Sequence, residues 1–334
     1  LAAMTSSIGL KRATTPVADE NFGWDVSLSS DGSTLAVASQ QADAFVGKPK
    51  SGVVTVYTRS DESWVYQVKL VAPNSGANDE FGSRISLSDD GNVLAISATG
   101  EDGDDNSLDN SGAVYVFTRD AQSAWSGSSD VATLRAGTDS TDNVADLYFG
   151  ASLSLSGDGT TLAVGTRQTA DNGEDGLMTD DGGVFVFHSD NNNVWTHQDS
   201  QNGSEPLKSA LILAADYFGW DVSLSNDGNT LAVGAPMADT PAPAAVTTGA
   251  AYIFTREGAI WTEQKTLEAS NKGAGDGFGF SVSLSGDGAS LVVGAIEEDG
   301  DATSTADTPN NSALNSGAVY FFTGSGANWT QKAY

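Results

Sequence analysis

The sequence predicts an all-β fold made of repeated four-stranded antiparallel units, and three features that recur together support this prediction. Phe-Gly pairs occur five times, 59 to 69 residues apart, and an Asp-Gly pair begins nine residues after each Phe. A stretch of alternating polar and apolar residues separates the two pairs, and an apolar run follows the second pair. The repeats begin near Phe22, Phe81, Phe149, Phe218 and Phe278.

The first two strands of each repeat are predicted on either side of the Asp-Gly pair. Val26-Ser27-Leu28-Ser29 alternates with the period of a strand that has one buried face. Asp31-Gly32 predicts a hairpin turn, because both residue types tolerate positive φ. Leu35-Ala36-Val37 is the apolar second strand. The glycine of each Phe-Gly pair is expected to allow a close backbone approach while the ring packs between repeats.

The rest of each repeat predicts two more strands. A variable acidic loop leads into a third strand such as Gly112 to Phe117, and a short turn with a tryptophan leads into a fourth such as Lys265 to Ala269. Four strands in roughly 60 residues, repeated along the chain, are typical of a β-propeller blade. The tryptophans are Trp64, Trp125, Trp195, Trp261 and Trp329.

The two ends of the chain are predicted to close the ring. The tail from Trp329 to Tyr334 begins a fourth strand, and the head from Ile8 to Ala13 has the pattern of its continuation. Pairing the two would remove the free edge of a sheet. We therefore expect a single β-propeller domain over residues 1–334, with five blades closed by pairing of the N- and C-terminal strand segments. The alternative is that the head completes the tail of a neighbouring molecule.

Composition excludes several classes of protein. The chain has 44 acidic and 15 basic residues, a net charge of -29, and no cysteine. Disulfides and thiolate metal sites are therefore excluded, and such an acidic chain would repel the phosphates of nucleic acid. No stretch reaches the 18 or so consecutive apolar residues of a transmembrane segment.

These repeats resemble the FG-GAP family, which includes the propellers of integrin α chains and bacterial secreted or surface proteins. The resemblance is carried by the five Phe-Gly pairs, by Gly-Ala at Gly234-Ala235 and Gly294-Ala295, and by the segment from Ser111 to Arg119. It implies a β-propeller, a secreted or extracellular location that can include the cell surface, calcium in some blade loops, and a role in binding or adhesion.

Three acidic loops after the second strand are candidates for the calcium implied by the resemblance. Calcium takes six to eight oxygen ligands from a compact loop, mostly carboxylates and carbonyls. A solvated acidic loop is the alternative interpretation. The candidate ligands are Asp102, Asp104 and Asp109 in the first loop, Asp171, Asp175 and Asp180 in the second, and Asp299, Asp301 and Asp307 in the third.

Two repeats share Phe-Gly-Trp-Asp, which gives candidate ligand-binding residues Trp24, Asp25, Trp220 and Asp221. If the first strands line a central channel, these tryptophans could bind a sugar or a peptide side chain; packing between blades is the alternative. Three sequons are candidate glycosylation sites, and they would matter only in a secretory pathway. They begin at Asn202, Asn310 and Asn328.

No catalytic motif stands out, so the sequence predicts a protein that is not an enzyme. It contains no nucleophile elbow, no zinc-binding His-Glu-x-x-His and no phosphate-binding loop. The expected function is an extracellular, non-enzymatic binding or adhesion module with calcium-stabilised loops, whose partner is a protein or carbohydrate. The alternative is a structural subunit of an extracellular filament or sheath, assembled with copies of itself by strand completion between neighbouring chains.

Overall fold

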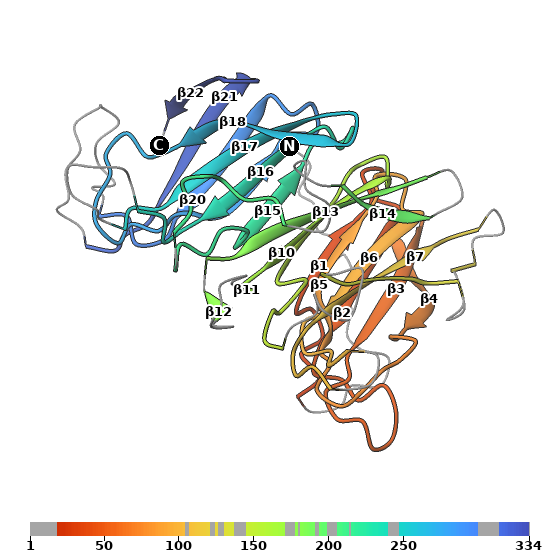
Figure 1. The fold of residues 1–334 in the computed structure, drawn as a ribbon. Coiled ribbons are helices and arrows are strands. Elements are labelled where there is room, and N and C mark those ends of the chain that lie inside the picture. Colours follow the sequence, from red (N-terminus) through yellow and green to blue (C-terminus); the bar gives the residue numbers. More distant parts are fainter. Residues whose placement is uncertain are drawn as a thin grey trace.

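The described part of the chain is all-β and contains five four-stranded antiparallel sheets (Figure 1). The computed structural model describes residues 19–103, 107–120, 124–125, 130–136, 145–170, 178–179, 181–190, 194–198, 206–213, 215–239, 247–299 and 314–333. In each sheet the strands follow the order of the chain, and each sheet corresponds to one predicted repeat. The architecture is consistent with a five-bladed propeller, and we call the sheets blades 1 to 5.

The blades share one plan. Blade 1 contains β1 (Val26–Leu28), β2 (Thr34–Ser39), β3 (Val53–Ser60) and β4 (Ser63–Leu70). Blade 2 contains β5 (Phe81–Leu87), β6 (Val93–Ala98), β7 (Ala113–Thr118) and β8 (Ala132–Leu134). Blade 3 contains β9 (Ser152–Leu155), β10 (Thr161–Thr166), β13 (Gly183–Ser189) and β14 (Trp195–Gln198), with the ribbon β11 (Thr169–Ala170) and β12 (Met178–Thr179) beside it. Blade 4 contains β15 (Asp221–Leu224), β16 (Thr230–Ala235), β17 (Ala250–Glu257) and β18 (Ile260–Leu267). Blade 5 contains β19 (Phe278–Leu284), β20 (Ser290–Ala295), β21 (Ala318–Ser325) and β22 (Asn328–Ala333).

The Phe-Gly pair attaches each blade to the one before it. At the first junction the Phe81 amide donates to the Ser51 carbonyl at 3.1 Å, and the Phe81 ring is fully buried. Gly52 lies so close that a Cβ there would stand 2.1 Å from the Phe81 carbonyl oxygen, so only glycine fits. The other three junctions repeat this contact, with Phe149 on Ser111, Phe218 on Asp181 and Phe278 on Thr248.

A second contact links the first strands of neighbouring blades. The Ser27 hydroxyl accepts a hydrogen bond from the Leu87 amide of the next blade at 3.0 Å. The same serine in the next three blades bonds a leucine amide in the same way, which gives the pairs Ser86–Leu155, Ser154–Leu224 and Ser223–Leu284. The alternating Val-Ser-Leu-Ser pattern thus serves two purposes, because its apolar residues fill the core and its serine joins the blades.

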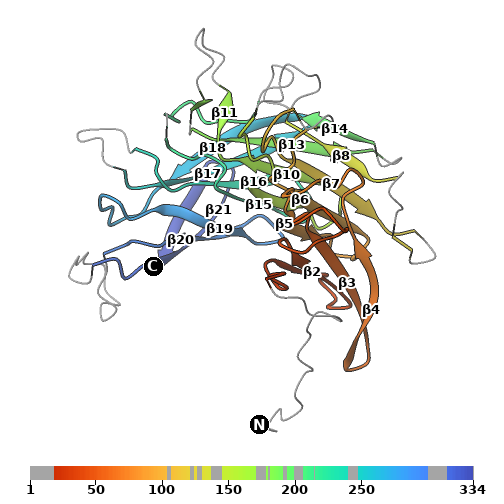
Figure 2. The ribbon, with the colours of Figure 1, turned by 90° about the horizontal axis from the view of Figure 1, so that it is seen from below.

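The predicted closure of the ring is not confirmed. Figure 2 shows the five blades in an arc, with an opening between blade 1 and blade 5. The tail residues form β22 and complete blade 5 themselves through pairs such as Phe321 with Ala333. The head from Ile8 to Ala13 lies outside the described residues. Closure through the head, like the single-domain assignment, therefore stays a prediction.

The exposure of apolar side chains at the two ends agrees with an open arc. Leu28 in blade 1 is 54% exposed, whereas its counterpart Leu224 in blade 4 is 7% exposed. Val319 in blade 5 is 61% exposed, whereas its counterpart Ala251 is fully buried. Each end blade thus has one apolar face that no other described blade covers.

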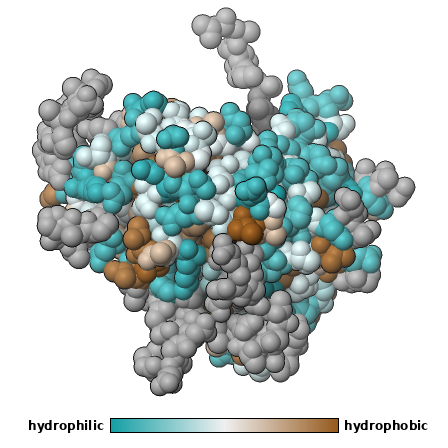
Figure 3. All heavy atoms as spheres, turned by 45° about the horizontal axis from the view of Figure 1, so that its top comes forward, coloured by the Kyte–Doolittle hydropathy of each residue, from teal (hydrophilic) through white to brown (hydrophobic). Residues whose placement is uncertain are grey.

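The surface is otherwise polar. On the face drawn in Figure 3, hydrophilic residues dominate and the hydrophobic ones form separate small patches. No helix long and apolar enough to cross a membrane is present in the described part of the chain.

Candidate functional site

A cavity of about 260 Å³ opens where residues next to or within the first strands of blades 2 to 5 converge. Its charged and aromatic lining comes from Arg84 in blade 2, Arg167 in blade 3, Trp220 and Asp221 in blade 4, and Phe280 in blade 5. Ala151 and Ser281 complete the lining.

The repeat itself places most of these residues around the cavity. Six of the seven stand one or two positions after a Phe-Gly pair, and that pair is held by the preceding blade. In blade 4, Gly219 has a φ of +88°, and the Trp220 amide donates to both the Tyr217 carbonyl at 3.1 Å and the Gly234 carbonyl at 3.2 Å. The junction contacts therefore also orient the side chains that line the cavity.

Aromatic rings hold one of the two arginines. The Arg167 guanidinium carbon lies 5.9 Å from the centroid of the Tyr148 ring and 5.9 Å from that of Trp220. Trp220 in turn packs against Phe280, with ring centroids 5.4 Å apart, and edge-on against Tyr217 at 5.9 Å. Cation–π contacts hold a guanidinium in place without neutralising it.

Neither arginine makes an ion pair with a described residue, although the chain is strongly acidic. In the described ranges, no carboxylate oxygen lies within 4.0 Å of a nitrogen of Arg84 or Arg167. Both side chains are exposed to solvent. Two cations at one cavity, neither in an ion pair with a described residue, favour the binding of an anion, or of a group that develops negative charge.

Among the described residues that line the cavity, Asp221 is the only one with a carboxylate. Its Oδ2 accepts a hydrogen bond from the Val282 amide at 2.8 Å, and its Oδ1 accepts one from the Val222 amide at 3.1 Å. Burial raises the pKa of Asp221 to about 6, while these hydrogen bonds and nearby Arg84 act in the opposite direction. At neutral pH the group is mostly ionised and can accept a proton.

Trp24 and Asp25 occupy the same repeat position in blade 1 but do not line the cavity. Trp24 is 50% exposed, and its Nε1 donates to the Ser83 carbonyl at 3.2 Å. Asp25 Oδ2 accepts from the Ile85 amide at 2.8 Å, and burial raises its pKa. The structure thus separates the two Trp-Asp pairs: both contact the next blade, but only Trp220 and Asp221 also line the cavity.

Sequence reasoning missed Arg84 and Arg167. Arg84 stands at the repeat position that Asp25 and Asp221 occupy, so a comparison of charge at this position would have found it. Arg167 follows β10 and belongs to a different position of the repeat. Only the three-dimensional arrangement of blades 3 and 4 brings it to Trp220.

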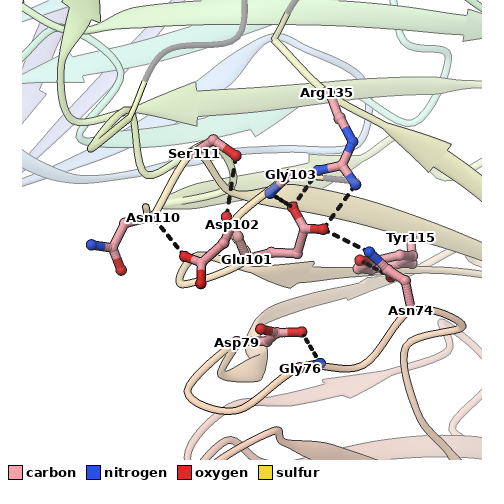
Figure 4. Close-up of polar contacts among 10 residues, drawn as sticks. All are labelled: Asn74, Gly76, Asp79, Glu101, Asp102, Gly103, Asn110, Ser111, Tyr115 and Arg135. Atoms are coloured by element: carbon pink, nitrogen blue, oxygen red, sulfur yellow. Dashed lines mark hydrogen bonds and ion pairs between the residues drawn. The ribbon is translucent and has the colours of Figure 1, made fainter. Parts of the chain in front are cut away.

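The first acidic loop uses its carboxylates for internal contacts (Figure 4). Glu101 is almost fully buried and makes a bidentate ion pair with Arg135, with an Nη2–Oε1 distance of 2.8 Å. Asn74 Nδ2 donates to the same carboxylate at 2.6 Å. Asp102 Oδ1 accepts a hydrogen bond from the Asn110 amide at 2.9 Å, which ties the two ends of the loop together.

The third loop repeats the last of these contacts, because Asp299 Oδ1 accepts a hydrogen bond from the Asn315 amide at 2.7 Å. The Asp109 carbonyl accepts from the Asp146 amide at 2.7 Å. In the parts of the chain that the structure describes, no three metal-ligating side chains form a cluster. The other predicted ligands lie outside these parts, so calcium stays a prediction; they are Asp104, Asp171, Asp175, Asp180, Asp301 and Asp307.

Of the three predicted glycosylation sites, Asn328 begins β22 and is exposed. Asn202 and Asn310 lie outside the described residues. Glycosylation stays a prediction.

Comparison with solved structures finds the same fold in proteins that include two named as lactonases. A protein of Bacteroides uniformis, provisionally assigned as a 6-phosphogluconolactonase, superposes with a TM-score of 0.55 at 12% identity, over 93% of this chain and 70% of its own. The periplasmic gluconolactonase of Pseudomonas aeruginosa superposes with a TM-score of 0.53 at 16% identity, over 92% of this chain and 70% of its own. A protein of Lactobacillus plantarum has a TM-score of 0.50 at 12% identity, with coverage of 93% and 70%.

These similarities overturn two expectations from the sequence. The expected non-enzymatic binding or adhesion module, together with its filament alternative, is contradicted because structures that share this fold are named as lactonases. The prediction that the protein is not an enzyme is corrected for the same reason. Both expectations were wrong because the cavity is built from residues of four blades, and such a site contains no catalytic motif that is continuous in the sequence.

Sequence comparison supports the predicted family. No curated protein matches the chain. The profile of the FG-GAP repeat matches residues 64–117, 212–254 and 261–322, which include strands of blades 1, 2, 4 and 5. The chain therefore carries FG-GAP repeats on a multi-blade β-propeller-type fold.

Proposed function

We propose that the protein is a hydrolase that opens a lactone ring in the cavity lined by Arg84, Arg167, Trp220 and Asp221. The observation that carries this proposal is the meeting of two arginines, neither in an ion pair with a described residue, with one carboxylate and an aromatic wall in one cavity. The fold shared with structures named as lactonases supports the choice of reaction. At 12 to 16% identity that likeness concerns the fold alone, so the chemistry has to be argued from this cavity.

Each group suits one part of lactone hydrolysis. The Asp221 carboxylate takes a proton from a water molecule as the water oxygen attacks the carbonyl carbon. The arginines stabilise the negative charge that develops on the carbonyl oxygen. The ring C–O bond then breaks, and Asp221 returns the proton to the leaving oxygen. One water molecule is consumed, and the product is a hydroxy acid whose carboxylate also suits the arginines.

The aromatic wall suits a sugar-derived lactone. Trp220 and Phe280 present ring surfaces on which the C–H faces of a sugar ring can pack. The cavity volume of about 260 Å³ is of the size needed for one small ring rather than a polymer.

The test is proton release from glucono-δ-lactone and its 6-phosphate at pH 7, followed at constant pH and corrected for spontaneous hydrolysis. Asp221→Asn keeps an oxygen for the Val282 amide but removes the base. We expect it to lower kcat/KM by about 10²- to 10⁴-fold, the usual contribution of general acid–base catalysis.

Asp25→Asn is the matched control. Asp25 makes the same kind of bond to the next blade and lies outside the cavity, so this variant should keep full activity. No acceleration by the wild-type protein, or equal losses in the two variants, would reject the proposal. A secreted location stays a prediction from the sequence.

A further inference from the structure

The backbone before each Phe-Gly pair adopts an unusual conformation that all five blades share. The residue directly before the phenylalanine has a φ between 53° and 68°, in the left-handed region. Its carbonyl accepts a hydrogen bond from the amide three residues later, at 3.0 to 3.1 Å in every blade. The five residues are Asn21, Glu80, Tyr148, Tyr217 and Gly277.

The five side chains differ in how well they suit this conformation. Glycine and asparagine adopt left-handed backbone angles at little cost, and the chain uses them in blades 5 and 1. Tyrosine in this region is strained, because its Cβ crowds the backbone. The turn therefore does not require Tyr148 or Tyr217, yet both are present where asparagine or glycine would fold more easily.

Both tyrosines contact the residues that line the cavity. Tyr148 lies against the Arg167 guanidinium at 5.9 Å from its ring centroid, and Tyr217 packs edge-on against Trp220, also at 5.9 Å. Arg167 also lies over Trp220, so the four side chains form one continuous cluster. Strained residues in native proteins concentrate at functional sites, where surrounding contacts hold them.

From this coincidence we infer that Tyr148 and Tyr217 are positioning residues, which hold Arg167 and Trp220 in place for an anionic substrate at the expense of backbone strain. The inference rests on the proposed function for the identity of the substrate. The placement of Arg167 and Trp220 by the tyrosines can be measured without it.

The experiment compares Tyr148→Asn, Tyr148→Phe and Glu80→Asn. Tyr148→Asn relieves the strain and removes the ring, Tyr148→Phe keeps both, and Glu80→Asn relieves the same strain in blade 2, away from the cavity. The first readout is the NMR signal of the Arg167 Nε–H group, identified by its loss in Arg167→Lys. Two rings beside the guanidinium should shift this signal away from its random-coil position.

We expect Tyr148→Asn to move the Arg167 signal toward the random-coil position and to raise KM for glucono-δ-lactone 6-phosphate about 10-fold, equivalent to about 1.4 kcal/mol of binding. Its kcat should fall as well, because a displaced Arg167 stabilises the negative charge that develops on the carbonyl oxygen less effectively. Tyr148→Phe and Glu80→Asn should leave both the signal and KM unchanged. Neither asparagine variant should lower the melting temperature, since each removes strain.

Tyr217→Asn is the second variant, and tryptophan fluorescence is its readout. Loss of the Tyr217 ring should shift the emission contributed by Trp220, obtained as the difference from the Trp220→Phe spectrum. An unchanged Arg167 signal in Tyr148→Asn, or an unchanged Trp220 emission in Tyr217→Asn, would overturn the inference for that tyrosine. If the signals move but the wild-type protein hydrolyses no lactone, the proposed function fails and the positioning role stands.

Discussion

The open arc predicts that equivalent phenylalanines differ in their contribution to stability. Phe149 is fully buried at a junction between blades and packs against Phe185 and Phe187, with ring centroids 5.5 and 6.1 Å away. Phe149→Ala should lower the free energy of unfolding by about 3–5 kcal/mol, the usual loss for a buried phenylalanine. Phe22 begins blade 1, has no preceding blade in the described structure and is only half-buried. Phe22→Ala should therefore cost about 1 kcal/mol, since full burial of a phenylalanine side chain contributes about 1.5–3 kcal/mol.

Urea unfolding, followed by tryptophan fluorescence and circular dichroism, measures the difference. Phe45→Ala is the control for a surface phenylalanine, because Phe45 is 49% exposed in the loop after β2, and its effect should be within about 0.5 kcal/mol. Equal losses for Phe22→Ala and Phe149→Ala would show that Phe22 is covered as the internal phenylalanines are. The reasoning from an open arc would then be refuted, and the closed ring expected from the sequence would be favoured.

Three further predictions follow from the same contacts. Gly112→Ala should lower the melting temperature far more than Gly317→Ala, although both glycines have φ near +75°. A Cβ added at Gly112 would stand 2.4 Å from the backbone oxygen of Phe149, whereas the atom nearest to a Cβ at Gly317 is 3.3 Å away. Burial raises the pKa of Glu298 from 4.5 to about 7, so its contribution to stability is fully present below about pH 4.5 and is lost as the pH rises through 7. The melting temperature should therefore fall between these two pH values. Glu298→Gln should make this fall smaller. If calcium binds the first acidic loop, it should raise the melting temperature above the value in EDTA. The double variant Asp102→Asn, Asp109→Asn should abolish this increase. An equal melting temperature of the wild-type protein in both buffers would contradict the prediction.

Local chemistry explains why the strands could be predicted. The segment Val26 to Ser29 alternates, Asp31-Gly32 turns the chain, and β1 and β2 lie on either side of that turn as expected. Asp31 Oδ1 accepts the Ser29 hydroxyl at 2.7 Å and the Ser33 amide at 2.8 Å, so the residues of the motif stabilise the turn by themselves. Such contacts are local, so five copies of the pattern predict five blades.

The arrangement of the blades depends on contacts that no local pattern contains. The apolar residues of blade 5 follow the same alternation as those of the inner blades, and yet Val319 is exposed where Ala251 is buried. Alternation indicates which face of a strand is apolar but not whether another blade covers that face. The rotation from each blade to the next is set by packing between sheets, and this rotation decides whether the ring closes.

Two of the five charged and aromatic residues that line the cavity could be predicted, for an identifiable reason. Trp220 and Asp221 were predicted because two repeats share Phe-Gly-Trp-Asp where the first strand was expected to line a central channel. Arg167 comes from the end of β10 and meets Trp220 only across the junction of blades 3 and 4. A residue whose role depends on a neighbouring blade leaves no periodic signal in its own repeat.

Some positions of the repeat make the same structural contact in every blade, whereas others differ between blades. This difference explains where catalytic residues can stand in this fold. The Phe-Gly pair, the serine of the first strand and the Asp-Gly turn make structural contacts that recur from blade to blade, so these positions are not free to vary. The residue before the Phe-Gly pair and the two residues after it make no side-chain contact that all blades share. Tyr148, Arg84, Trp220 and Asp221 all occupy such positions, which lie toward the cavity in blades 2 to 4. Because the scaffold residues already hold the blades together, substitutions at these few positions can change the reaction without rebuilding the fold.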